Sequence, residues 1–371
     1  MRVIVTLVLV ALAVLGGVAT AQDIPVFCGD LSEDDCALLT EATETMREVE
    51  SAVFHLDLDF SLSGIPEAPV DSIHFQINGD GAFALDNEAL RALGEFYTSP
   101  ETMMENIEEL PTMIADALQA ISADATFVLE IPAELREESP TPLPDRVSLS
   151  ARLVDGFIYI NLDKLADLDA TGSMPRGWQG FDLAGFYREL LEQQMDTFEE
   201  AFSAMPGLNT MNAFADPEFM SNFTTLERLE DAEIDGQDAA VFQTTLDYGA
   251  MFSDPTIQDY LRSSLEGMGG FGGTKPDPEM VEMMMNMYAQ MFDGLTLEMT
   301  QTIGQDDHYI HQVGMHLDWT PAFGAMFGMR GANMNFVFDL QIDLARFNDA
   351  PEITAPEDAT IHPLDLMAPN L

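Results

Sequence analysis

The histidines are the first residues of this sequence that could support catalysis or metal binding. His308 and His311 are close in the chain, but the strand expected there places them on opposite faces, where they cannot share a metal ion. His55 and His74 fall on the polar sides of two other expected strands. We therefore predict no metal site and interpret most of the histidines as solvated residues of strands. The six histidines are His55, His74, His308, His311, His316 and His362.

Carboxylate pairs are the second candidate for chemistry, because two neighbouring acids can serve as acid and base. Asp57 with Asp59, and Asp339 with Asp343, line up on single faces of expected strands. The chain has 65 acidic residues, so such alignments arise by chance, and a solvated outer face accounts for them. The sequence also lacks Gly-x-Ser-x-Gly, His-Glu-x-x-His and a phosphate-binding glycine loop. We predict that the protein is not an enzyme, has no catalytic residues and needs no cofactor.

The charge of the chain excludes some classes of partner. Its 65 acidic residues against 14 basic ones give a formal net charge of −51. Such a surface keeps a protein soluble and repels nucleic acids and anionic membrane surfaces. Nothing in the charge identifies a protein of the cell envelope as a partner, and that possibility stays open.

The N-terminus predicts export. Residues 1–21 contain Arg2, an apolar run from Val3 to Val14 and an Ala19-Thr20-Ala21 cleavage site, which are the parts of a secretory signal peptide. The apolar run is shorter than the ~20 residues that span a membrane, and no second run follows. We expect an extracytoplasmic mature chain (secreted, periplasmic or in the cell envelope) without a transmembrane segment. Cys28 and Cys36 fit an oxidising compartment and are expected to form a local disulfide, with half of a metal site as the alternative.

Alternation of apolar and polar residues predicts strands along much of the chain. In the segment from Asp293 to Trp319, Leu297 and Met299 point to one side while Glu298 and Thr300 point to the other. This pattern is typical of a β-hairpin with one apolar face and one solvated face. Similar alternation occurs in residues 52–62, 73–85, 126–131, 147–162, 224–248 and 335–344. Within residues 147–162, Asp155-Gly156 predicts a primed hairpin turn.

Helical periodicity interrupts the strands. We predict one domain over residues 22–371, with helical insertions at about 87–121, 181–220 and 254–292. The last insertion ends in a methionine-rich helix, Met280 to Phe292, which we expect to cover the apolar side of the following hairpin.

These elements predict an α+β protein with a single large, curved, antiparallel sheet. We expect an open half-barrel of about ten strands, with amphipathic helices covering its concave apolar face. A β-sandwich is the rival arrangement. A second sheet, however, would leave the amphipathic helices without an apolar surface to pack on.

Four short segments have a pattern found in a known group of proteins. They are Asp155–Tyr159, Gly177-Trp178-Gln179, Ile234–Asp238 and the closing segment Phe347–Ala359. They resemble the LolA/LppX-type (LppX/LprG-like) superfamily of lipid carriers over about residues 48–359. The resemblance implies an open half-barrel closed by helices around a cavity for acyl chains, with no catalytic residues. We expect the chain to depart from many members in having no lipidated cysteine and in having long helical insertions.

The 24 methionines indicate what the apolar face could do. Flexible thioether side chains suit an apolar wall that accepts ligands of different shape, although ordinary packing on the sheet is the alternative. We predict that the protein binds or carries a lipid or other long apolar ligand between sheet and helices. A packed scaffold or interaction module of the cell envelope, with the same fold and no ligand, is the second hypothesis. The predicted cavity residues are Phe54, Leu56, Leu58, Phe60, Phe75, Met283, Met287, Leu297, Met299, Phe336, Phe338 and Leu340.

Overall fold

The computed structural model describes residues 26–64, 72–97, 106–138, 142–169, 171–204, 217–234, 236–267, 277–321 and 334–363. Within these ranges, no helix is both long enough and apolar enough to cross a lipid bilayer. The predicted signal peptide, residues 1–21, lies outside them.

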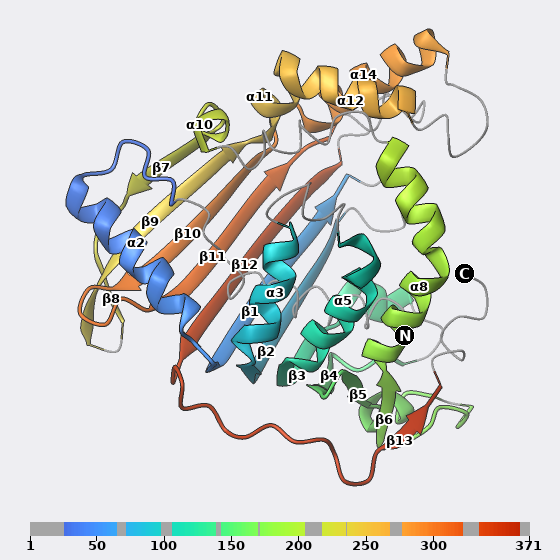
Figure 1. Ribbon diagram of the computed structural model, residues 1–371. Coiled ribbons are helices and arrows are strands. Elements are labelled where there is room, and N and C mark those ends of the chain that lie inside the picture. The colour runs from blue at the N-terminus through green and yellow to red at the C-terminus, as the bar shows by residue number, and fades with distance from the viewer. Residues whose placement is uncertain are drawn as a thin grey trace.

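The described strands belong to one open sheet (Figure 1). They are β1 (Ser51–Ser63), β2 (Ser72–Leu85), β3 (Ile121–Glu130), β4 (Arg146–Val154), β5 (Phe157–Asn161), β6 (Trp178–Asp182), β7 (Thr224–Arg228), β8 (Ala232–Ile234), β9 (Gln237–Asp247), β10 (Thr296–Gly304), β11 (Ile310–Trp319), β12 (Asn335–Ala345) and β13 (Thr360–His362).

The order of the strands confirms the predicted class of fold. The sheet runs β13-β6-β5-β4-β3-β2-β1-β12-β11-β10-β9-β7, with β8 paired to β9. Its pairs are antiparallel except for β13, which runs parallel to β6. Over the described residues the sheet has 13 strands, so the prediction of about ten was too low. The difference lies in strands such as β6, β8 and β13, which are too short to show an alternating pattern.

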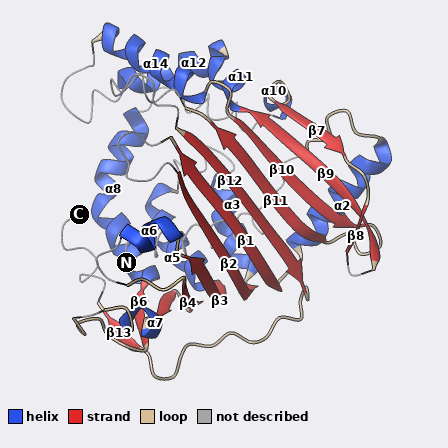
Figure 2. Cartoon of the chain, turned by 180° about the vertical axis from the view of Figure 1, so that it is seen from behind, coloured by secondary structure: helices blue, strands red, loops and turns tan. Residues whose placement is uncertain are grey.

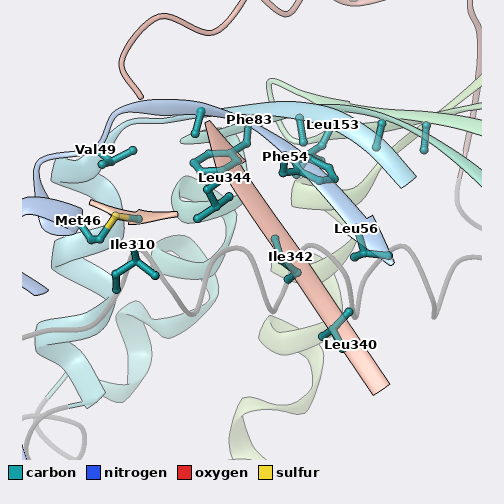
Figure 3. Packing of buried hydrophobic residues seen from close by; sticks show 14 of the residues in the cluster. Met46, Val49, Phe54, Leu56, Phe83, Leu153, Ile310, Leu340, Ile342 and Leu344 are labelled. Atoms are coloured by element: carbon teal, nitrogen blue, oxygen red, sulfur yellow. The ribbon is translucent and has the colours of Figure 1, made fainter. Parts of the chain in front are cut away.

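Strand β1 illustrates how the sequence produces the two faces of the sheet. Phe54 and Leu56 point to one face and are buried, whereas His55 and Asp57 point to the other. The apolar face continues sideways, since Phe54 lies opposite Leu344 of β12. Figure 3 shows the labelled side chains of β1, β2 and β12 in one packed cluster with Met46 and Val49.

The pairing of β1 with β12 joins the two halves of the chain in the middle of the sheet. It runs without a shift in register from Val53 opposite Ala345 to Ser63 opposite Asn335. These partners come from opposite ends of the sequence. The central seam therefore depends on the two halves of the sheet assembling together.

Helices cover one end of the apolar face (Figure 1). Helix α2 (Glu33–Arg47) is capped by Ser32, whose hydroxyl accepts a hydrogen bond from the backbone N–H of Asp35 at 3.2 Å. Its buried side chains join the main core. The same face also carries α3 (Asn87–Tyr97), η1 (Ile107–Glu109), α5 (Leu110–Gln119) and α8 (Leu183–Ala204). Figure 2, seen from behind, shows β1 and β9 to β12 uncovered on the other face.

A second group of helices lies at the opposite end of the strands. It comprises α10 (Pro217–Met220), α11 (Tyr248–Ser253), α12 (Pro255–Gly267) and α14 (Pro278–Phe292). Helix α14 buries Val281 and Met285, which pack with Leu261 of α12. This side of α14 is therefore directed toward α12. Contact with the following hairpin, which α14 was expected to cover, comes from its last turn, where Phe292 stacks on Trp319. Side chains of α2, α5 and α8 pack in the main core. Two short helices, α6 (Ala133–Glu138) and α7 (Asp163–Ala166), complete the described chain.

Two local predictions are confirmed. Cys28 and Cys36 form a disulfide with a Cα–Cα distance of 5.4 Å, which ties the chain before α2 to the first turn of this helix. Asp155 and Gly156 have φ angles of 53° and 76°, as a primed turn between β4 and β5 requires.

Replacing Ile342 tests the assignment of the two faces. Ile342 is 2% exposed on the apolar face of β12, whereas Val337 lies half-buried on the opposite face of the same strand. We expect Ile342→Ala to lower the free energy of unfolding by about 3 kcal/mol through cavity formation. The matched control Val337→Ala should cost less than about 1 kcal/mol. Urea unfolding measures both, and equal losses would contradict the assignment.

Candidate ligand-binding surface

The apolar face of the sheet changes from buried to half-buried along each central strand. On β1, Phe54 and Leu56 are 2% and 5% exposed, but Leu58 and Phe60 on the same face are half-buried. The change occurs where β1 leaves the region covered by α2, α3 and α5 and approaches the end that carries α14. The alternation of apolar residues thus continues beyond the main core.

The half-buried residues form a continuous patch, because their registers bring them side by side. Phe60 lies opposite Phe75 of β2 and Phe338 of β12, and Phe338 lies opposite Leu317 of β11. Leu317 in turn lies opposite Leu297 of β10. We call this patch the open apolar surface. It comprises Leu58, Phe60, Leu62, Ile73, Phe75, Ile77, Leu297, Met299, Leu317, Trp319, Phe336 and Phe338.

A chain of aromatic rings connects the open apolar surface to α14. The ring of Phe292, at the end of α14, lies 6.4 Å from that of Trp319 in a stacked orientation. Trp319 lies 5.4 Å from Phe336, and Phe336 lies 6.5 Å from Phe60. The indole N–H of Trp319 also donates a hydrogen bond to the carbonyl of Met291 at 2.8 Å. These contacts fix the last turn of α14 at the end of the surface.

The predicted cavity residues fall into three places. Those on the open apolar surface are Leu58, Phe60, Phe75, Leu297, Met299, Phe336 and Phe338. Those in the buried core are Phe54, Leu56 and Leu340. Met283 and Met287 belong to α14, where Met287 is half-buried and Met283 is 64% exposed. The structure therefore brings together the strand residues but not the α14 residues.

Several residues of the open apolar surface were missed as site candidates. They are Leu62, Ile73, Ile77, Leu317 and Trp319. The sequence contains the pattern that could have identified them, since each of these residues continues the apolar–polar alternation of a predicted strand. Large aliphatic and aromatic side chains, rather than methionines, form most of the patch.

The opposite face of the central strands carries histidine–aspartate pairs. His55 Nδ1 lies 2.8 Å from a carboxylate oxygen of Asp80 on β2. His316 Nδ1 lies 2.6 Å from a carboxylate oxygen of Asp339 on β12. The side chains of His55, His316 and Asp339 are about half-exposed and that of Asp80 is largely exposed, as predicted for a solvated face. Among the described residues, no group of three or more His, Cys, Asp or Glu side chains is placed to hold a metal ion.

A polar hollow of about 460 Å³ lies on this face. Its lining includes Asp57, Asp59, Glu298, His316, Asp339 and Gln341. Its carboxylates accept hydrogen bonds from neighbouring strands, for example from the Gln76 amide to Asp59 at 3.0 Å and from the Gln243 amide to Glu298 at 2.8 Å. The predicted carboxylate pairs thus serve to connect adjacent strands.

Two histidines on this face are electrostatically stabilised in their charged form. The hydrogen bond to Asp80 raises the pKa of His55, assisted by the charge of Asp57 and opposed by partial burial. The hydrogen bond to Asp339 raises the pKa of His316 in the same way, assisted by the charges of Glu298 and Asp318. The protonated histidines therefore stabilise the folded sheet.

Comparison with known proteins gives no match to a family model or a curated protein. Similar solved structures include the Mycobacterium tuberculosis lipoprotein LppX, at 11% identity over 87% of this chain and 100% of that chain, with a TM-score of 0.30. LprF from Mycobacterium bovis matches at 10% identity over 88% of this chain and 98% of that chain, with a TM-score of 0.33. A third is the MucA/MucB complex of Pseudomonas aeruginosa, at 9% identity over 87% of this chain and 64% of that chain, with a TM-score of 0.23.

At identities of 9–11% and TM-scores of 0.23–0.33, these likenesses carry no statement about the function of this chain.

The raised histidine pKa values predict a pH dependence of stability. A group whose pKa is higher in the folded state stabilises the fold below its ordinary pKa, about 6.5 for histidine, and loses this effect as the pH rises through the folded value. We therefore expect the double variant His55→Gln/His316→Gln to lose more stability relative to the wild type at about pH 5.5 than at about pH 8.5. Urea unfolding at both pH values measures the difference.

A control variant separates this effect from the general charge of the chain. Lys164→Gln removes an exposed positive charge at both pH values, so its effect on stability should change little with pH. An equal loss for the histidine variant at both pH values would contradict the assigned pairs.

Proposed function

We propose that the protein binds the acyl chain of a lipid, or another long apolar ligand, on the open apolar surface. The observation that carries this proposal is the continuous row of half-buried side chains from Phe75 across Phe60, Phe338 and Leu317 to Leu297. Soluble proteins rarely leave contiguous apolar patches unused, and such patches mark binding sites. The patch lies on the same face as the packed core, so a ligand there would extend that core.

The energetics of such binding need no specific polar group. Each buried methylene contributes ~0.8 kcal/mol, so a sixteen-carbon chain would contribute on the order of 10 kcal/mol before the costs of ordering. Apolar contact of this kind leaves few sequence motifs. Binding by apolar contact also agrees with a site that consists of the regularly alternating apolar residues of strands.

The two ends of the open apolar surface differ. The rings of Trp319 and Phe336 line it beside α14, whereas the buried core at Phe54 and Leu56 closes it at the other end. On α14 itself, Met280 and Met283 are 49% and 64% exposed. Flexible methionine side chains adapt to ligands of different shape, so we place the entrance for the ligand at this end.

The setting of this function is extracytoplasmic. The signal-like residues 1–21 predict export, and the Cys28–Cys36 disulfide is of a kind that persists in oxidising compartments. The net charge of −51 disfavours nucleic acids and anionic membranes as partners. The proposed role is non-enzymatic binding or carriage, performed by a single domain over residues 22–371.

Native mass spectrometry of the purified protein tests this proposal. We expect the wild type to carry co-purified lipid, and Phe60→Asp to reduce the bound fraction at least about tenfold, because an unpaired charge against apolar surface costs several kcal/mol. Ser61→Asp adds the same charge at the next residue, on the opposite face, and should retain the lipid.

Thermal unfolding of the same variants distinguishes a ligand site from a packed scaffold. Because Phe60 is half-buried, we expect Phe60→Asp to lower the free energy of unfolding of the lipid-free protein by only about 1–2 kcal/mol. Absence of lipid from the wild type, together with a large loss of stability in Phe60→Asp, would favour the scaffold and overturn the proposal.

A further inference from the structure

A second pocket lies at the edge of the sheet, between α7, β6 and β13. Its volume is about 590 Å³, within the range of ~300–1,000 Å³ that is usual for small-molecule sites. It shares no residue with the open apolar surface. Its apolar walls are Leu162, Leu165, Leu168, Met174, Pro175 and Phe181.

The mouth of this pocket exposes large apolar side chains. Leu168 is 40% exposed and Met174 is 37% exposed. A molecule seated between them would remove apolar surface from water on both sides, which favours binding. The deeper wall is formed by Leu162 and Phe181, which are buried members of the main core. The pocket therefore has a rigid floor and an accessible opening.

Polar atoms are placed at one side of the pocket. Gln179 is only 3% exposed, and its amide nitrogen donates to the carbonyls of Arg176 at 2.7 Å and Gly177 at 3.4 Å. The amide oxygen of Gln179 must therefore accept the 2.7 Å hydrogen bond that joins it to Nε2 of His362. In the neutral imidazole, this bond fixes the proton on Nε2 and makes Nδ1 an acceptor.

The ring of His362 is also stacked on Phe181, with centroids 5.6 Å apart.

The loop at the mouth is held in place by one carboxylate. Asp169 accepts hydrogen bonds from the hydroxyl of Thr171 at 2.5 Å, the hydroxyl of Ser173 at 3.1 Å and the backbone N–H of Met174 at 2.7 Å. These bonds lower the pKa of Asp169 and occupy its oxygens. The carboxylate therefore positions Met174 and repels an anionic ligand.

We propose that this pocket binds an uncharged, mainly apolar molecule that carries a hydroxyl group, such as a phenol or a medium-chain alcohol. The apolar walls hold its hydrocarbon part, and its hydroxyl donates to Nδ1 of His362. The nearby carboxylate of Asp169 excludes a carboxylate ligand. This site is independent of the acyl-chain site proposed above.

Phenol and toluene are suitable probes, because they have similar size and only phenol can donate a hydrogen bond. Their binding to the full chain can be followed by NMR of ¹³C-methyl methionine, with the Met174 signal assigned from Met174→Leu. We expect a saturable shift of Met174 with phenol and toluene, and none with benzoate at the same concentrations.

The variant His362→Phe keeps an aromatic ring against Phe181 but removes both ring nitrogens. We expect it to raise the dissociation constant of phenol relative to that of toluene about tenfold, since one hydrogen bond is lost for phenol only. His74→Phe, on the polar face of β2, is the matched control and should leave this ratio unchanged.

Two results would overturn the proposal: a Met174 signal that neither phenol nor toluene shifts, or a phenol-to-toluene ratio that His362→Phe does not change. Phe60→Asp should leave phenol binding intact, so failure of the acyl-chain proposal and failure of this one are distinguishable. Leu165→Trp, which fills the pocket from within, provides a second test. It should abolish the Met174 shift in protein whose thermal unfolding remains cooperative.

Discussion

The one-sided burial of the central strands is the constraint on which the rest of this structure depends. Strands β1, β2, β10, β11 and β12 place mostly apolar residues on one face, and this face must be removed from water. At one end of the strands, the apolar face is covered by α2, α3 and α5, and Phe54 and Leu56 are buried there. At the other end, the same alternation produces the half-buried open apolar surface.

The polar face has a complementary structural role. The pairs of His55 with Asp80 and of His316 with Asp339 connect neighbouring strands on both sides of the β1–β12 seam. This seam joins segments from opposite ends of the sequence, so the sheet depends on side-chain contacts on both of its faces. A chain of strongly negative charge benefits in particular from histidines that become positive when protonated.

Much of the fold could be predicted from local patterns. The period of two residues identified the faces of the long strands, Asp155-Gly156 predicted its turn, and the cysteine pair predicted its disulfide. The site could be predicted only in part, because Leu56 and Leu58 have the same place in the alternation but differ in burial. That difference depends on where α2, α3 and α5 end in space. Likewise α14 packs on α12, and its sequence pattern does not specify which partner it buries.

Photo-crosslinking with a diazirine-labelled fatty acid, mapped by mass spectrometry, tests the central claim most directly. The account predicts labels on the open apolar surface, at Phe60, Phe336, Phe338 and neighbouring strand residues, and their loss when unlabelled fatty acid competes. Labels confined to the polar face, or labelling that does not saturate, would contradict it.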